Sequence, residues 1–279
     1  MGAENRNRVV RSPGVAGFFY PADKLSLERD LSLLLENAPL ETFPRPIRGM
    51  IVPHAGYGYS GGVAARGYRQ ILGQKYDVII LIAPAHRLFF SHPTVFPGDS
   101  FLTPLGEIPV DKQFVELLHR KHPEIQLSTK GFESDEHSLE VQLPFLQWVV
   151  ENVKIVPIMM GDQSLQVINL LSNALIDVLK ERNFLVIASS DLSHYYNDSQ
   201  ARAMDQVVMN HVTGFDPDAL YKDIESRRCE MCGYGPSITA MKVAKALGAQ
   251  EGKVLLYRNS GDVTGERHNV VGYLAAVFY

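Results

Sequence analysis

The sequence predicts an α/β protein with three layers, in which helices cover both faces of a central, mostly parallel mixed sheet. Three apolar runs rich in Ile and Val support this prediction, and they lie within residues 49–57, 77–86 and 184–194. Continuous apolar runs of this kind are typical of parallel strands that are buried on both faces. The chain has 279 residues, 46% of them hydrophobic, and can therefore bury a core of this size.

The N-terminal part of the chain is expected to lead into the first strand. We expect residues 1–12, which are polar, to be flexible. An aromatic turn at 16–23 precedes a predicted helix near 24–37, where leucines recur at mostly helical spacing. After the first strand, four glycines mark a turn, and residues 63–72 are predicted to form a crossover helix to the second strand.

The rest of the chain continues this alternation of strands and helices. The remaining predicted elements are short strands or loops over 93–105, helices over 112–122 and 137–150, a strand over 153–159, a helix over 165–181, helices near 199–213, 216–227 and 236–247, and strands over 253–257 and 270–279. Asp135 is a suitable N-cap for the 137–150 helix, and Pro144 should kink it. No long linker or repeat divides the chain, so residues 1–279 are expected to form a single domain.

The composition excludes several classes of partner. The net charge of −4 provides no basic surface for nucleic acid or an anionic membrane. No apolar run approaches the roughly 20 residues that a membrane helix needs. Residues 1–6 lack the apolar core of a signal peptide, and Arg6 stands where myristoylation requires Ser or Thr. We therefore expect a cytoplasmic protein.

Histidines follow the first two apolar runs, at His54 and His86. Ligands of open α/β sheets bind outside the carboxyl ends of parallel strands, so these side chains are expected to meet there. Two neutral imidazoles held by rigid strands suit a divalent metal ion. The alternative is that each histidine is only a hydrogen-bonded loop residue.

The third run ends in Asp191 and His194. A histidine three residues beyond a carboxylate, beside a metal, is suited to general acid/base chemistry. Asp191 could instead be only the N-cap of the segment that follows.

His137 lies at the N-terminus of the predicted 137–150 helix. The helix dipole would keep its imidazole neutral and would attract an anionic group. A surface histidine without a function is the alternative.

The two cysteines, Cys229 and Cys232, are separated by two residues. A zinc ribbon would need a second cysteine pair, and a thioredoxin-like motif should follow a strand, whereas a predicted helix precedes this one. The remaining possibilities for Cys232 are a single soft metal ligand near a helix N-terminus, where its thiolate would be favoured, or an inert buried cysteine. Cys229 is expected to have no role.

Five sequence blocks in order give the chain a resemblance to the Memo-like family. The blocks are Pro53-His54-Ala55-Gly56-Tyr57, Ala83-Pro84-Ala85-His86, Asp135-Glu136-His137-Ser138-Leu139-Glu140, Ser190-Asp191-Leu192-Ser193-His194 and Cys232-Gly233. The resemblance covers nearly the whole length, from Ala16 to Tyr273. It implies a fold similar to that of the class III extradiol, non-haem iron dioxygenases.

Carried over residue by residue, the resemblance implies that His54 and His86 are metal ligands and that His194 is the acid/base residue. His137 matches the additional pocket histidine of those relatives. Cys232 stands where the dioxygenases place a glutamate, and its softer thiolate shifts the preference towards copper, or towards iron bound differently. Activity on a catechol is therefore not implied.

The resemblance also implies partners. Memo-like proteins are linked with copper- or iron-dependent redox chemistry and, in animals, with binding of phosphotyrosine peptides. In microbes they occur beside AMMECR1-like and radical-SAM proteins, which are the expected protein partners.

Three hypotheses follow from these residues. In the first, the protein is a metal-dependent oxidoreductase of unknown substrate. Its metal is iron or copper, with zinc possible, and it is held by His54, His86 and Cys232. Asp191 and His194 move protons, and His137 orients an oxyanion or hydroxyl group.

The other two hypotheses keep the same pocket. In the second, the protein is a non-catalytic module that binds a peptide or anion through His54, His137 and the glycine-rich helix start after Gly58. In the third, it is a zinc-dependent hydrolase.

Overall fold

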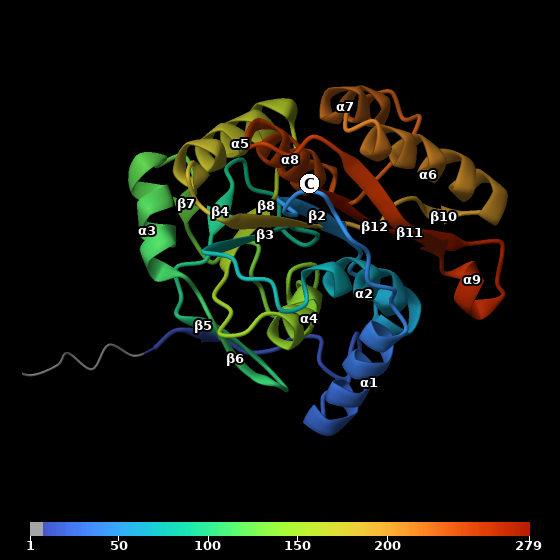
Figure 1. Cartoon of the computed structure of the whole chain (residues 1–279), viewed down its shortest axis with the longest axis horizontal. Helices are drawn as coiled ribbons and strands as arrows, with labels where there is room; N and C mark the ends of the chain where they lie inside the picture. The colour runs from blue at the N-terminus through green and yellow to red at the C-terminus, as the bar shows by residue number, and fades with distance from the viewer. Residues whose placement is uncertain (1–7) are drawn as a thin grey trace, which may run out of the picture.

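The computed structural model describes residues 8–279 and consists of a large mixed sheet with helices on both faces (Figure 1). The strands of this sheet are β2 (Gly49–Val52), β3 (Val78–Pro84), β4 (Thr94–Val95), β7 (Gln126–Leu127), β8 (Val156–Met160), β9 (Phe184–Ser189), β10 (His194–Tyr196), β11 (Gly252–Asn259) and β12 (Val270–Phe278). Their order is β10-β12-β2-β9-β3-β8-β4-β7, and β11 pairs with β12. The α/β prediction is confirmed.

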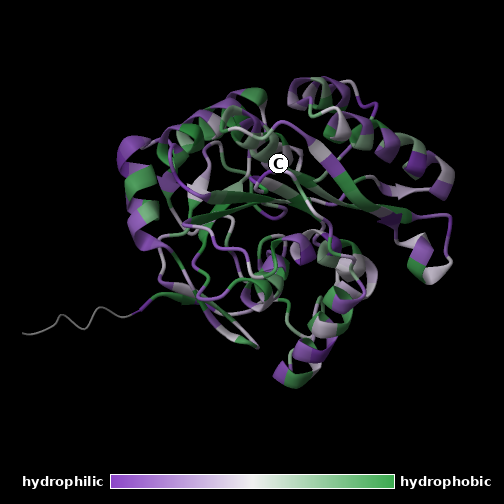
Figure 2. Ribbon diagram, in the orientation of Figure 1, coloured by the Kyte–Doolittle hydropathy of each residue, from purple (hydrophilic) through white to green (hydrophobic). Residues whose placement is uncertain are grey.

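Helices cover the sheet on two sides, which gives the three layers. They are α1 (Lys24–Glu36), α2 (Gly62–Tyr68), α3 (Lys112–Lys121), α4 (Leu143–Val149), α5 (Leu165–Leu179), α6 (Asp198–Thr213), α7 (Pro217–Glu225), α8 (Tyr234–Ala246) and α9 (Gly261–Thr264). In Figure 1, α1, α2 and α4 lie below the sheet, and α5, α6 and α8 lie above it. Figure 2 shows hydrophobic residues concentrated in the central strands, while the helices alternate between hydrophobic and hydrophilic residues. Within residues 8–279, no helix combines the length and apolar character needed to cross a membrane.

The centre of the sheet positions the carboxyl ends of the three apolar runs. β2 pairs in parallel with β9, and β9 pairs in parallel with β3. Every residue of these three strands is buried, which explains their continuous apolar sequences. Because the strands run in the same direction, the segments that follow them meet at one edge of the sheet.

A smaller sheet holds part of the N-terminal segment. β1 (Val10–Arg11) pairs in parallel with β5 (Ser100–Thr103), which pairs with β6 (Gly106–Pro109). Of the segment 1–12 expected to be flexible, residues 1–7 lie outside the described residues. For Val10 and Arg11 the expectation is wrong, because they form strand pairs and because the Arg11 side chain is bound by a buried carboxylate.

The predicted helix over 137–150 is shorter in the structure. A single 3-10 turn, η3 (Glu140–Gln142), precedes α4, and residue 137 lies outside both. Pro144 does not kink a helix, because it occupies the first turn of α4, where its missing N–H needs no partner. Asp135 is exposed, and η3 begins without a side-chain cap.

Candidate metal centre

His54 follows β2 and is buried, with 2% of its surface exposed. Its backbone N–H donates to Asp191 Oδ1 over 2.8 Å, and its Nδ1 lies 2.9 Å from Ser189 Oγ. Burial lowers the pKa of His54 well below its usual value, and the nearby imidazoles of His86, His137 and His194 lower it further. The ring is therefore neutral and held at Nδ1, which leaves Nε2 available as a ligand atom.

His86 lies two residues beyond the end of β3 and is held by Glu136. The backbone N–H of His86 donates to Glu136 Oε2, and its Nδ1 lies 3.0 Å from Glu136 Oε1. Burial opposes ionisation of Glu136, but hydrogen bonds from His86 and Ser138 outweigh it and lower the carboxyl pKa to about 2. Glu136 is therefore an ionised acceptor, so His86 also offers Nε2.

Cys232 is placed by the loop that leads into α8, close to the end of β9. Its Sγ accepts the backbone N–H of Asp191 over 3.2 Å, and its own N–H donates to the Asp191 carbonyl. Burial, followed by the nearby Asp191 carboxyl group, raises the pKa of the thiol. The expectation that a helix N-terminus would favour the thiolate is wrong for the metal-free protein, because burial dominates.

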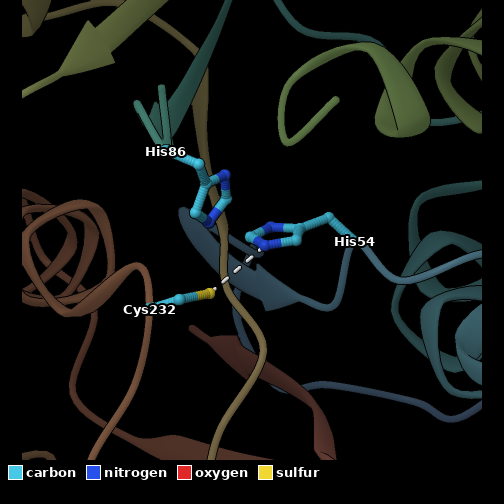
Figure 3. A group of neighbouring side chains, drawn as sticks. All are labelled: His54, His86 and Cys232. Atoms are coloured by element: carbon cyan, nitrogen blue, oxygen red, sulfur yellow. Dashed lines mark hydrogen bonds between the residues drawn. The ribbon is translucent and has the colours of Figure 1, made fainter. Parts of the chain in front are cut away.

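These three side chains converge from three separate segments, as Figure 3 shows. One ligand atom from each of His54, His86 and Cys232 lies within 4.8 Å of the other two. Cys232 Sγ lies 3.2 Å from His54 Nε2. Around a tetrahedral metal, bonds of about 2.3 Å to sulfur and 2.0 Å to nitrogen place the two ligand atoms about 3.5 Å apart. The separation of Cys232 Sγ and His54 Nε2 therefore matches that of two ligands of one ion, and a ligand atom of His86 lies within 4.8 Å of both.

His137 lies directly against this group. Its ring stacks on His86 with centroids 5.0 Å apart and an interplanar angle of 11°, and it lies 4.5 Å from the Phe19 ring. Burial, and then repulsion from His86, lower its pKa to about 4. The imidazole is neutral, as expected. Burial rather than the expected helix dipole keeps it neutral, because the nearest helical turn begins only at Glu140.

His137 also belongs to a second possible donor set. His86, Glu136 and His137 each offer an atom within 4.8 Å of the others. This set would need His86 to bind through Nδ1, because Glu136 lies at that nitrogen. The Nδ1–Glu136 hydrogen bond would then be lost, so we favour the set that contains Cys232.

Asp191 is buried, and its carboxylate accepts the backbone N–H groups of His54 and Ala55. Burial raises its pKa to about 7. These hydrogen bonds fix the turn that presents His54, so Asp191 has a positioning contact in addition to the proton-transfer role expected for it.

His194 begins β10, where its backbone N–H donates to Glu230 Oε1 over 2.8 Å. Burial lowers the pKa of the His194 imidazole, against an opposing effect of Glu230. A neutral, partly exposed imidazole whose charge is felt by His54 and His86 is able to accept a proton, which is what the acid/base role requires.

Sequence reasoning gave no role to four residues that support this site. They are Glu136, Ser189, Gln142 and Glu230. Glu136 stands beside His137 in a block that the sequence already singled out, so a signal for it existed. The hydrogen bond between Ser189 and Gln142 joins positions 47 residues apart, and no local pattern indicates it.

Comparisons with known proteins agree with one another over almost the whole chain. The family model described as Memo-like protein matches residues 11–277. A MEMO1 family protein of Methanopyrus kandleri is 36% identical over 281 residues, covering 97% of this chain and 99% of its own. One from Aquifex aeolicus is 37% identical over 270 residues, covering 96% and 99%.

A solved structure supports the fold alone. An uncharacterized protein of Escherichia coli K12 superposes with a TM-score of 0.54 and 12% sequence identity, covering 84% of this chain and all of its own. The more specific likeness to extradiol dioxygenases stays a prediction.

Proposed function

This chain belongs to the Memo-like protein family, and we propose that it binds iron or copper through His54, His86 and Cys232 and acts as a metal-dependent oxidoreductase. The convergence of the three donors carries the proposal. Each imidazole is engaged at Nδ1 by a protein group, which is the usual arrangement of metal-binding histidines.

The donor set favours a redox-active metal. Two imidazoles with one thiolate combine borderline and soft ligands, which suit copper and iron, and zinc also accepts them. When bound, the metal would supply Lewis acidity or one-electron chemistry. A coordination position is left for a substrate ligand, because residues 8–279 provide three donors in this set rather than four.

The surrounding side chains would handle protons and orient the substrate. His194 and His137 are both neutral near pH 7 because burial lowers their pKa values, so each is ready to accept a proton or a hydrogen bond. Asp191, with a pKa of about 7, changes charge in the same range. The substrate class stays open between a small molecule and a peptide.

A purely anion-binding module has less support. The glycine-rich helix start after Gly58, which this hypothesis assigns to a phosphate or carboxylate together with His54 and His137, lies in the turn Tyr57–Gly61. Several N–H groups of this turn are bonded to carbonyl groups of the protein. Tyr57 donates to the Phe19 carbonyl, and Tyr59 and Ser60 donate to that of Gly56. These groups are therefore not available to a ligand.

The proposal is tested by titrating metal-stripped protein with iron(II), copper(I) and zinc, and then measuring oxygen uptake. We expect tight binding of iron or copper and oxygen consumption that His86→Ala abolishes. The matched control is His92→Ala, since His92 is exposed on the same segment. Peptide or anion binding that survives chelation, without turnover, would favour the module. Ester cleavage with zinc and without oxygen would favour the hydrolase.

We further propose AMMECR1-like and radical-SAM proteins as partners and the cytoplasm as the location. The location is supported by the two cysteines, which are both free thiols. Affinity capture from the cytosolic fraction of a source cell would test both proposals, and failure to recover either partner class there would count against them.

A further inference from the structure

Ser189, the last residue of β9, lies at the centre of a buried polar network behind His54. Its Oγ lies 2.9 Å from His54 Nδ1, 2.8 Å from Gln142 Nε2 and 2.6 Å from the Ser138 carbonyl oxygen. Ser189, Gln142 and Ser138 are fully buried. Because water does not reach these polar groups, each of them must find its hydrogen-bond partners within the network.

The orientation of the Gln142 amide is fixed by the backbone carbonyl of Pro53. Its Nε2 lies 2.9 Å from the carbonyl oxygen of Pro53, which can only accept. Its Oε1 accepts the Tyr68 hydroxyl over 2.9 Å. The second hydrogen of Nε2 therefore points at Ser189 Oγ.

The direction of the Ser189 hydroxyl follows. A hydroxyl has one proton to donate and two lone pairs that accept. The Ser138 carbonyl oxygen can only accept, so it takes the Ser189 proton, and Gln142 donates to one of the lone pairs. At the position of His54 Nδ1, Ser189 can then only accept.

We propose that Ser189, oriented by Gln142, is a positioning residue that holds His54 in the tautomer with its proton on Nδ1, so that the Nε2 lone pair faces Cys232. The consequence for metal binding rests on the proposed function, whereas the tautomer itself does not. His86 is oriented by an ionised carboxylate, and His54 by a neutral chain of hydrogen bonds. A neutral chain suits a deeper position, where an unpaired buried charge is costly.

The first measurement is the tautomer of His54 in the metal-stripped full-length protein. Long-range proton–nitrogen NMR of protein labelled with ¹⁵N-histidine, near neutral pH, distinguishes protonated from unprotonated ring nitrogens. His54 is assigned by the loss of its signal in His54→Gln. We expect a protonated Nδ1 and an unprotonated Nε2 in the wild type. A proton on Nε2 would overturn the proposal, and this result needs no variant of Ser189 to fold.

The second measurement compares Ser189→Ala with Ser172→Ala. Ser172 is also buried, but its hydroxyl bonds to the Ile168 carbonyl within α5, away from the site. In Ser189→Ala we expect His54 to populate the Nε2–H tautomer and zinc affinity to fall by about 10–100-fold. Ser172→Ala should change neither.

An unchanged tautomer in Ser189→Ala would overturn the proposal. So would a changed tautomer with unchanged zinc affinity, since the lone pair would then not matter for binding. If wild-type protein binds neither zinc, iron nor copper, the proposed function fails, while the wild-type tautomer still decides the assignment of Ser189.

Discussion

At the scale of single residues, the two histidines of the candidate metal centre are not equivalent. Glu136 is ionised and accepts a hydrogen bond from His86, which makes that imidazole a stronger donor to a metal. The Ser189 hydroxyl is neutral, so its hydrogen bond with His54 raises the electron density of that imidazole less than Glu136 does for His86. Of the two imidazoles, only His86 is therefore supported by an anionic hydrogen-bond acceptor.

Replacing Glu136 tests this difference. We expect Glu136→Gln to lower metal affinity by about 10–100-fold, because the amide loses the charge that supports His86. Glu133→Gln is the control, since Glu133 lies on the same segment and its carboxylate accepts the nearby Gly131 N–H rather than a group of the site. Isothermal titration with zinc measures both. Equal affinities for the two variants would contradict this role of Glu136.

Metal binding should also release a proton from Cys232. Because the pKa of its thiol is raised, the sulfur is protonated at neutral pH, and a metal binds the thiolate. His54 and His137 are already neutral there and release nothing. Apparent affinity should therefore rise by about tenfold per pH unit near neutrality.

Calorimetry in buffers of different ionisation enthalpy measures this proton release directly. Wild-type protein should release about one proton per metal bound. Cys232→Ser should bind more weakly and release about one proton fewer per metal than the wild type. Release that is unchanged in Cys232→Ser would show that the proton comes from another group.

At the scale of the elements, α2 packs closely against β2, the strand that leads to His54. Gly67 makes this approach possible, because a Cβ at that position would lie 2.8 Å from Val52 Cγ1 and 3.0 Å from Met50 Sδ. Val52 is stiff at χ1 and fully buried, so it has little freedom to move away. The close packing of β2 thus depends on having glycine, which has no side chain, at position 67 of α2.

Two alanine substitutions in α2 separate this contact from helix propensity. Gly62→Ala places its Cβ in open space and should stabilise the protein by up to about 1 kcal/mol. Gly67→Ala gains the same helix propensity, but its Cβ overpacks the contact between α2 and β2. This overpacking should lower the free energy of unfolding by about 1–3 kcal/mol. We therefore expect Gly67→Ala to be the less stable of the two in urea unfolding. Equal stability would show that β2 adapts freely.

At the scale of the whole molecule, a buried ion pair connects the small sheet to the segment that carries Glu136. Arg11 Nη1 lies 2.5 Å from Glu140 Oε2, with both side chains almost fully buried. Arg11 also donates to the backbone carbonyl of Glu136 over 2.8 Å. Glu140 in turn accepts the N–H groups of Gly14 and Val15. The pair therefore fixes the N-terminal segment against the candidate metal centre.

Breaking this pair should destabilise the entire fold. Glu140→Gln leaves the Arg11 charge buried without a counter-ion, and we expect a loss of about 3–5 kcal/mol in the free energy of unfolding. Glu107→Gln removes the same charge from the exposed Arg8–Glu107 pair and should cost only about 0–1 kcal/mol. Urea titrations followed by circular dichroism compare the two. A loss below 1 kcal/mol for Glu140→Gln would contradict the role given to the pair.

The sequence by itself determined the architecture. Strands buried on both faces have continuous apolar runs, and helices buried on one face have leucines at helical spacing. The local sequence therefore indicates which faces of an element are buried. The three runs gave β2, β3 and β9, and the leucines of 24–37 gave α1. The convergence of His54 and His86 was also predicted, because parallel strands of one sheet end at the same edge. Cys232 follows no strand, and only the resemblance implied that it completes the set.

Only the tertiary structure decided how these side chains are held and charged. The partners of the two imidazoles, Ser189 and Glu136, come from distant positions in the chain, and spacing does not reveal them. The Cys232 thiol stays protonated because burial outweighs the helix terminus, and Arg11 is ordered by a carboxylate 129 residues away. Local patterns record which face of an element is buried. Hydrogen-bond direction and protonation depend on which groups packing brings together in the absence of water.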